Sequence, residues 1–335
     1  MNASLPKDLP RDLDDLRLLL MDVEAEAFGD LIQSRFPRLS MRRIDNYADL
    51  PGALEELRPN IFLGRKITSG NQHPYPRGII LGSPDIRWIH VTSMGCDHYL
   101  PWDPEKVTLT VSKLNQDDIM SQYVLARMLY FGMGMHRMLK NQAARVWDRQ
   151  PQHPLTGKTH VVVGFGVIGR AIAERSRMLG MQVFGVRASG APDPIADKMV
   201  RTEQMLEVLG EGDYVTLILP KTPDTLGMFG REAFAAMKPG AVLINIGRGG
   251  IVDEDALVEA LESGKLSGAA FDVFANEPMP EDSPLWSVEN LVISPHCAAL
   301  VEGWRTRGIE AFCINLERWL RGDALKDVVD PSKGY

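Results

Sequence analysis

A short β-branched strand runs directly into three closely spaced glycines, and no other feature constrains the fold as strongly. The strand covers residues 160–163, and the turn after it is Gly164-Phe165-Gly166-Val167-Ile168-Gly169. A helix is predicted over residues 168–179, ended by a glycine, and a second strand over residues 182–186. In such a unit the glycines permit a tight turn, close approach of a pyrophosphate and close helix–strand packing. These six residues therefore predict a dinucleotide-binding site.

The residue at the end of the second strand bears on which dinucleotide binds. An acidic residue there would accept a hydrogen bond from the ribose 2′-hydroxyl of NAD, but the sequence has Arg187, followed by Ser189. A guanidinium and a hydroxyl suit a 2′-phosphate instead, which favours NADP over NAD. Arginine is also mostly exposed in proteins, so a surface charge without a ligand is the alternative interpretation.

The overall composition excludes several classes of protein. The 335 residues are 44% hydrophobic, which is enough for two domains. A net charge of −7 and scattered basic residues argue against a nucleic-acid partner. The N-terminus lacks a secretory pattern and no apolar run approaches the ~18 residues of a membrane span, so we expect a cytoplasmic protein with no membrane partner. Cys96, Cys297 and Cys313 have neither disulfide-framework nor metal-site spacing, so no bound metal is expected.

Strand-like runs alternate with helical stretches along two parts of the chain. The predicted strands are residues 18–21, 60–63, 88–91, 109–110, 183–186, 214–219, 241–245, 268–271 and 291–294. This alternation predicts an α/β fold of two Rossmann-like domains with parallel sheets and a cleft between them, the larger being a doubly wound dinucleotide-binding domain. A helix predicted over residues 302–321 is too short to fold alone and is expected to return to the first domain. The expected domains are residues 1–118 with 298–335, and residues 119–297.

Three residues that could perform chemistry follow predicted strands of the second domain, where parallel sheets bind their ligands. Arg248 lies in a glycine-rich turn, and its planar fork of donors suits a carboxylate; the local sequence equally allows it to cap the turn or pair with Asp253. Glu277 precedes a proline and His296 follows one, and each alone is a common structural residue. If the two meet, the carboxylate favours the imidazolium, which can protonate a carbonyl oxygen. The set predicts reduction of a 2-keto acid by a nicotinamide.

With these residues in place, the chain resembles the D-isomer-specific 2-hydroxyacid dehydrogenase family, which includes glyoxylate/hydroxypyruvate reductases and phosphoglycerate dehydrogenases. The resemblance runs from about residue 87 to the C-terminus, whereas the first ~60 residues match only in pattern. The matching segments are residues 87–97, 122–126, 147–157, 219–225, 237–240, 245–254, 271–274, 277–278, 282–286 and 294–296.

The resemblance implies roles for particular residues and for the two domains. It implies that Arg248, Glu277 and His296 form a catalytic triad, that the first domain binds substrate, and that a helix starting near Asp118 crosses between the domains and contributes to a homodimer interface. Further residues implied to bind substrate or cofactor are the backbone amides of Met94, Gly95 and Cys96 for the substrate carboxylate, Asp272 for the nicotinamide carboxamide, and Pro220 and Thr225 for the cofactor.

The chain also departs from the family pattern. Met94-Gly95-Cys96 replaces the usual Ala-Gly-Val, and residues 111–116 differ from the common small-residue loop. These two segments are expected to line the cleft, and the choice of substrate depends on the geometry of the loops around Arg65, Lys66, Met94 and Trp102, so the substrate's identity cannot be carried over.

The function predicted from these features is NADPH-dependent reduction of glyoxylate or hydroxypyruvate. An NAD-preferring D-2-hydroxyacid dehydrogenase is one alternative, and a dinucleotide-sensing protein like the family's corepressor relatives is another. The chain ends soon after the last predicted helix, without a disordered partner-binding extension, which favours the enzyme. A third possibility is formate oxidation on the same scaffold. The resemblance implies that such a site has glutamine in the place of Glu277, so Glu277 argues against this activity.

Overall fold

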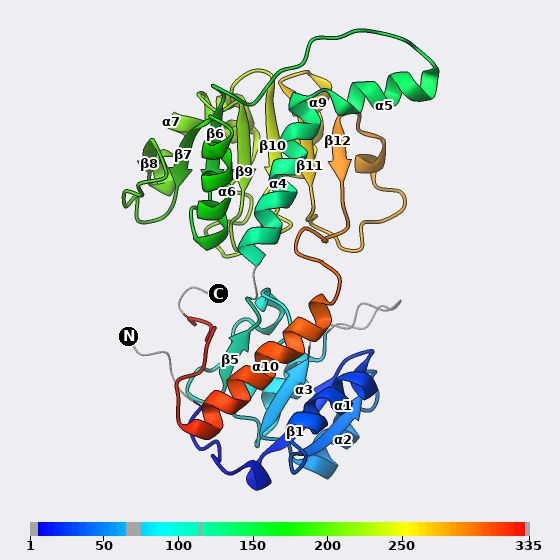
Figure 1. Cartoon of the computed structure of the whole chain (residues 1–335), viewed down its shortest axis with the longest axis vertical. Coiled ribbons are helices and arrows are strands. Elements are labelled where there is room, and N and C mark those ends of the chain that lie inside the picture. Colours follow the sequence, from blue (N-terminus) through cyan, green and yellow to red (C-terminus); the bar gives the residue numbers. More distant parts are fainter. Residues whose placement is uncertain (1–5, 65–74, 114–115, 332–335) are drawn as a thin grey trace. The chain divides into compact units, whose positions relative to one another are not determined.

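The computed structural model describes residues 6–64, 75–113 and 116–331. The chain divides into two compact units, Met1–Leu114 with Val301–Tyr335, and Asn115–Leu300 (Figure 1). Residues 116–118 and 298–300 fall in the second unit, whereas the sequence interpretation placed them in the first domain. Arg65 and Lys66 lie outside the described residues.

The first unit is built on a parallel five-stranded sheet. Its strands are β1 (Arg17–Met21), β2 (Ser40–Ile44), β3 (Ile61–Gly64), β4 (Trp88–Val91) and β5 (Thr108–Val111), in the order β2-β1-β3-β4-β5. This is one of the two common orders of doubly wound sheets. Sequence analysis missed β2, because exposed and half-buried residues alternate along this edge strand and form no apolar run.

Helices cover both faces of this sheet. Helices α1 (Ala25–Arg35) and α10 (Trp304–Arg321) pack on the face that carries Leu18 and Leu20, and α2 (Leu50–Leu57) and α3 (Arg77–Gly82) on the face that carries Leu19 and Met21. Two 3-10 turns, η1 (Leu13–Asp15) and η2 (Asp97–Tyr99), complete the unit. The C-terminal helix thus returns to the core of the first unit, as Figure 1 shows.

The second unit has a parallel seven-stranded sheet. The strands are β6 (Thr159–Val163), β7 (Gln182–Val186), β8 (Lys198–Val200), β9 (Tyr214–Leu217), β10 (Ala241–Asn245), β11 (Leu266–Phe271) and β12 (Leu291–Ile293), in the order β12-β11-β10-β9-β6-β7-β8. Numbered within the unit, this is the Rossmann order 3-2-1-4-5-6 with a seventh strand added. The predicted α/β fold with two Rossmann-like parallel sheets is therefore confirmed. Only the three-residue edge strand β8 was not expected.

The helices of the second unit form a layer on each face of its sheet. Helix α4 (Gln116–Gly132) packs against α6 (Val167–Met178), and α4 also contacts β10. The opposite face carries α7 (Met205–Leu209), α8 (Arg231–Ala236) and α9 (Glu254–Glu262), whose apolar residues share one core with the strands. Helix α5 (Met135–Ala144) and the short turns η3 (Thr202–Gln204) and η4 (Pro284–Ser287) lie in the connections. Within the described ranges, no helix has the length and apolar character to cross a bilayer.

Candidate active site

The predicted site residues of the second unit all follow strands at one edge of the sheet. Because the strands are parallel, their carboxyl ends meet at this edge, and a doubly wound sheet binds its ligands where the strand order reverses, here between β6 and β9. The residues at this edge are Gly164 after β6, Arg187 after β7, Pro220 after β9, Arg248 after β10, Asp272 after β11 and His296 after β12.

The three glycines of the turn have three different surroundings. A Cβ on Gly164 would collide with the Ile218 carbonyl, and φ is +102° there, so the tight turn needs glycine. A Cβ on Gly169 would collide with the Gly164 carbonyl, so α6 can pack closely only with glycine at this position. A Cβ on Gly166 would meet no heavy atom within 4 Å. The open space beside Gly166, at the N-terminus of α6 with its unpaired N–H groups, fits a pyrophosphate.

The other residues of the turn contribute in unequal ways. The Phe165 side chain is buried and packs against Gly185 of β7, so any contact of Phe165 with a cofactor would be through its backbone. Val167 is 77% exposed and Ile168 is half-buried, and both lie in the first helical turn of α6.

Arg187 is held by its own loop. Its Nε donates to the Ala191 carbonyl at 3.0 Å, and one terminal nitrogen donates to the carbonyls of Ala191 and Pro192. Ser189 Oγ accepts a hydrogen bond from the Ala191 amide at 3.2 Å, and its residue is exposed. The interactions of Arg187 and Ser189 therefore order the segment after β7, where an adenosine ribose would lie.

The segment after β9 is a compact turn closed by Thr225. Thr225 Oγ1 donates to the Pro220 carbonyl at 2.6 Å and accepts from the Thr222 amide at 2.9 Å. The Lys221 ammonium lies beside Gly250, two residues from Arg248.

Close backbone packing holds the Arg248 turn in place. A Cβ on Gly247 would come within 2.8 Å of the Leu219 carbonyl, and one on Gly249 would collide with the Phe274 carbonyl. Arg248 itself is half-buried and donates to the Gly247 carbonyl at 2.9 Å. The glycines therefore let the arginine turn lie against the segment that leads to Glu277.

Glu277 and His296 meet. His296 Nδ1 and Glu277 Oε2 are 2.7 Å apart, and Glu277 Oε1 accepts the Phe274 amide at 2.9 Å. Burial opposes ionisation of Glu277, but hydrogen bonds from His296 and the Phe274 amide, with the charges of His296 and Arg248, outweigh it and lower the pKa of Glu277. His296 Nε2 has no hydrogen bond to any residue described, and half of the His296 side chain is exposed. One ring nitrogen is therefore oriented and the other is accessible.

Asp272 anchors the loop that carries His296. Its side chain is buried and accepts hydrogen bonds from Ser294 Oγ at 2.6 Å and from the amides of Cys297 and Ala298 at 2.9 and 2.8 Å. Burial and the nearby Asp272 raise the pKa of Cys297, which keeps this residue a neutral thiol. Sequence reasoning did not assign a role to Ser294, although a polar residue directly after a strand at this edge was a usable signal.

The predicted substrate loop follows β4 in the first unit. Met94 and Gly95 are half-buried, and their amides donate no hydrogen bond to another described residue. Cys96 is buried, and its carbonyl accepts the Tyr99 amide at 2.9 Å. Two unengaged amides after a parallel strand are suited to an anion.

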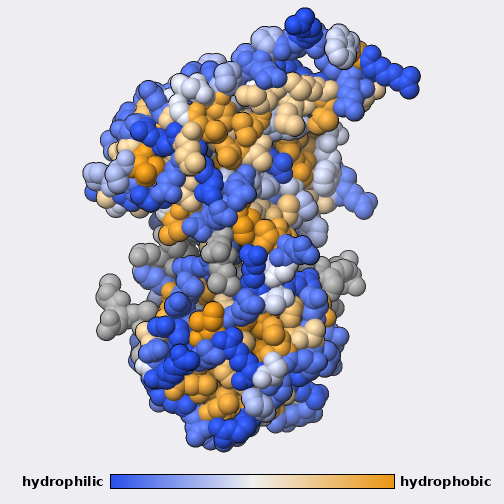
Figure 2. Space-filling view, viewed as in Figure 1, coloured by the Kyte–Doolittle hydropathy of each residue, from blue (hydrophilic) through white to orange (hydrophobic). Residues whose placement is uncertain are grey.

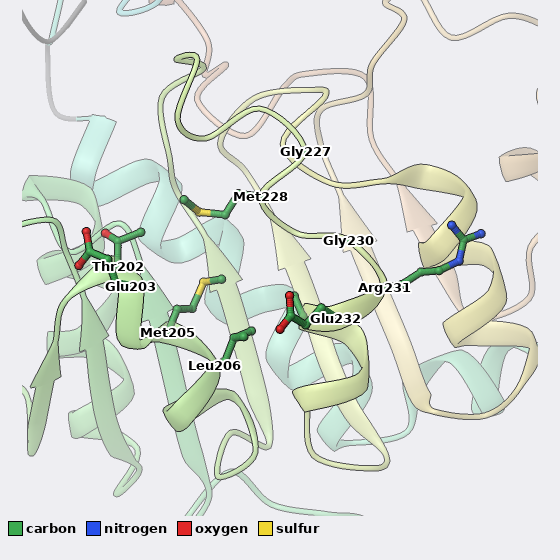
Figure 3. Close-up of a pocket in the computed structure, with 10 residues that line it drawn as sticks. Thr202, Glu203, Met205, Leu206, Gly227, Met228, Gly230, Arg231 and Glu232 are labelled. Carbon is green, nitrogen blue, oxygen red and sulfur yellow. The ribbon is translucent and has the colours of Figure 1, made fainter.

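Two hollows of the second unit lie away from these residues. One, of about 350 Å³, opens between α7 and the start of α8, where Met205, Leu206 and Met228 gather (Figure 3). The other, of about 760 Å³, is lined by the amino-terminal ends of β10 and β12 and by α5. No predicted site residue lines either hollow. Within the described ranges, no three side chains of metal-binding type cluster.

The fold places the chain among dinucleotide-binding α/β proteins, and comparisons with known proteins specify the class further. The family model of the D-isomer specific 2-hydroxyacid dehydrogenase, NAD binding domain, matches residues 125–298. Glyoxylate/hydroxypyruvate reductase B of Yersinia pestis is 30% identical over 86% of this chain and 88% of its own length. The glyoxylate reductase of Korarchaeum cryptofilum is 37% identical, and the chain spans about half of it, 52%.

A solved structure agrees with these matches. The D-isomer specific 2-hydroxyacid dehydrogenase family protein of Aeromonas salmonicida aligns with a TM-score of 0.80 and 29% identity, covering 94% of this chain and 99% of that protein. The chain therefore belongs to the D-isomer specific 2-hydroxyacid dehydrogenase family, as its sequence motifs indicated. Membership places it in the class of NAD(P)-dependent dehydrogenases that act on CH–OH groups.

Proposed function

We propose that the protein reduces a short 2-keto acid of the glyoxylate or hydroxypyruvate type to the D-2-hydroxy acid, with NADPH as the preferred reductant. The observation that carries this proposal is the 2.7 Å hydrogen bond between His296 and Glu277, at the sheet edge that also holds the glycine turn. An imidazole oriented by a carboxylate can give a proton to a nascent alkoxide and remove it in the reverse direction.

Each residue of the proposed triad has a separate task. The nicotinamide supplies the hydride when the dinucleotide is bound. Arg248 binds the carboxylate of the keto acid and polarises the neighbouring carbonyl. His296 donates the proton from Nε2 to the carbonyl oxygen, and Glu277 holds the ring through Nδ1.

The substrate class is supported by the names of the relatives and by the loop after β4. Both reductases described above are named for glyoxylate, and one also for hydroxypyruvate. We propose that the first unit binds substrate and that the amides of Met94, Gly95 and Cys96 receive its carboxylate. The second unit binds the dinucleotide through residues 164–169, Pro220, Thr225 and Asp272, which meets the nicotinamide carboxamide.

A substrate panel at fixed NADPH tests the proposal. Glyoxylate, hydroxypyruvate, pyruvate and 3-phosphohydroxypyruvate are assayed with the wild type, with His296→Ala and with His153→Ala, an exposed histidine outside the site, as the matched control. We expect turnover of glyoxylate and hydroxypyruvate. The turnover rate should fall 10²-fold or more in His296→Ala only, roughly the contribution of a general acid. No turnover with any keto acid would instead favour a dinucleotide-sensing protein.

The preference for NADPH rests on Arg187 and Ser189 after β7. In the structure Arg187 is half-buried and can turn from the carbonyls of Ala191 and Pro192 towards a 2′-phosphate, which offers stronger, charge-assisted bonds. Arg187→Asp should lower kcat/KM for NADPH by about 10- to 100-fold and spare NADH. Arg231→Ala, which removes an exposed ion pair to Glu259, is the control. A wild type that prefers NADH would refute this part.

We also propose that the protein is a cytoplasmic homodimer. Figure 2 shows apolar side chains gathered on the face of the second unit that carries α4. On and after α5, Met138 and Leu139 are about half exposed and Trp147 is 95% exposed, which is unusual for such large side chains in a monomer.

None of the three cysteines, all of which the structure describes, forms a disulfide, in keeping with a reducing compartment. Sedimentation velocity and cell fractionation test the two statements.

A further inference from the structure

We infer that Tyr123 and Ser294 are positioning residues of the proposed reaction, because with Asp272 they form a hydrogen-bonded chain that holds the loop of His296. The inference rests on the proposed function, since it requires that His296 exchanges the proton. Neither Tyr123 nor Ser294 belongs to the triad, and neither is needed to explain dinucleotide binding.

His296 lies in a backbone conformation that needs support from its surroundings. Its φ is +51°, in the left-handed region that non-glycine residues rarely adopt. The His296 amide donates to the Asp272 carbonyl at 2.8 Å, and the next two amides, of Cys297 and Ala298, donate to the Asp272 carboxylate. Because three successive amides bind one residue, Asp272 determines the path of this loop.

The Asp272 carboxylate in turn depends on Ser294. Asp272 is only 2% exposed, and a buried carboxylate is strongly unfavourable unless donors surround it. Ser294 Oγ donates to Asp272 Oδ1 at 2.6 Å, on the same oxygen that accepts the Cys297 amide. Ser294 is itself buried and follows β12, so it links the carboxylate to the end of the strand that leads into His296.

Tyr123 completes the chain from a distant helix. Its hydroxyl on α4 is hydrogen-bonded to Ser294 Oγ. Ser294 has one proton, which goes to Asp272, so Tyr123 must be the donor. Burial raises the pKa of Tyr123, and Asp272 adds to this, against opposing hydrogen bonds with Ser294 and Arg127, so the phenol keeps its proton. Arg127, one turn along α4, places its guanidinium 4.4 Å from the centre of the tyrosine ring and restrains it.

The hydrogen bonds among these residues therefore join three elements at Asp272, which orients the His296 loop. They reach α4 through Tyr123, β12 through Ser294 and β11 through Asp272 itself. Loss of the Tyr123 hydroxyl leaves Ser294 without a donor and loosens the anchor, while the imidazole and its partner Glu277 stay chemically intact. Because the perturbation acts on orientation, we expect it to lower kcat more than it changes KM.

The test compares Tyr123→Phe, Ser294→Ala and Ser294→Thr with the wild type, measuring kcat and KM for the keto acid, NADPH affinity and thermal unfolding. Tyr130→Phe is the matched control, because Tyr130 lies on the same helix and takes no part in the hydrogen bonds that link Tyr123, Ser294 and Asp272. His296→Ala is included as well. We expect kcat to fall about fivefold in Tyr123→Phe and about tenfold in Ser294→Ala, roughly the values of one hydrogen bond and of an unsatisfied buried group. KM for the keto acid should change less than twofold, and Ser294→Thr, which keeps the hydroxyl, should restore kcat.

The outcomes separate this inference from the function on which it rests. Wild-type turnover in His296→Ala overturns the proposed function itself. Loss of turnover in His296→Ala with wild-type kcat in both Tyr123→Phe and Ser294→Ala overturns only the positioning role. Equal losses in Ser294→Thr and Ser294→Ala, or a lowered unfolding temperature with an unchanged kcat at an assay temperature where the variant is folded, also overturn it.

Discussion

Gly166→Ala separates ligand binding from folding within the glycine turn. The substituted Cβ would meet no heavy atom within 4 Å, and Gly166 has φ −93°, which alanine adopts without strain. The free energy of unfolding should therefore stay the same or rise by up to about 1 kcal/mol, because alanine restricts the unfolded chain. The space that the methyl group enters is the space we assign to the pyrophosphate. Overpacking between the methyl group and the pyrophosphate should cost about 1–3 kcal/mol, which weakens dinucleotide binding by about 5- to 150-fold.

Gly169→Ala is the opposite case in the same turn. Its Cβ would collide with the Gly164 carbonyl, so the fold itself should lose about 1–3 kcal/mol. In a unit of this size that corresponds to a fall of roughly 2–12 °C in Tm. Gly52→Ala in α2 of the first unit, where a Cβ also meets nothing, is the control for both variants.

The assays are NADPH titration by isothermal calorimetry and thermal unfolding by circular dichroism. The reasoning predicts a Gly166→Ala protein with the wild-type Tm and weak binding, and a Gly169→Ala protein with a lowered Tm. A Gly166→Ala protein that is as unstable as Gly169→Ala, or that binds NADPH as tightly as the wild type, would refute the assignment of this space to the cofactor.

Three further predictions follow from other parts of the structure. Burial lowers the pKa of His90 and of His160 to about 3 from the ordinary 6.5, so their stabilisation is complete above pH 6.5 and is lost as the pH falls towards 3. The free energy of unfolding should drop by roughly 2 kcal/mol per histidine between pH 8 and pH 5. In urea titrations, His160→Gln should remove the contribution of one histidine to this drop. A dependence of the free energy of unfolding on pH that is the same in His160→Gln and the wild type would contradict this. Gly249→Ala forces the Arg248 turn away from the Phe274 carbonyl and should reduce kcat/KM at least tenfold, with NADPH affinity retained in calorimetry. Trp147→Ala should shift sedimentation from dimer towards monomer, by about 2 kcal/mol of association free energy if the indole is an anchor, whereas an unaltered dimer would exclude that role.

Local sequence patterns predicted much of the fold. The buried strands were found because continuous apolar runs bounded by turn residues are distinctive, and the glycine turn because each glycine meets a separate steric requirement. Strands β2 and β8 were missed because an edge strand buries little and its sequence needs no apolar run. The family was recognised from the order of many short motifs, each of which is local.

The contacts of the site were beyond the reach of local patterns. The sequence could state the consequence of a meeting between Glu277 and His296, but their contact depends on how the connection between β11 and β12 folds back. The chain from Tyr123 to Ser294 spans 171 positions, and the positive φ of His296 has no sequence signature. The orientation of the Arg187 guanidinium towards its own loop was likewise decided by backbone carbonyls that no motif specifies.

Periodicity and glycine placement are properties of neighbouring residues, so most of the strands, the glycine turn and the residues at the carboxyl ends of strands can be located from the order of residues alone. Contacts between those residues depend on the folded chain. The pairing of β10, β11 and β12 and the packing of α4 bring together side chains that are far apart in the chain, and hydrogen bonds between such residues exist only once the parallel sheet has formed.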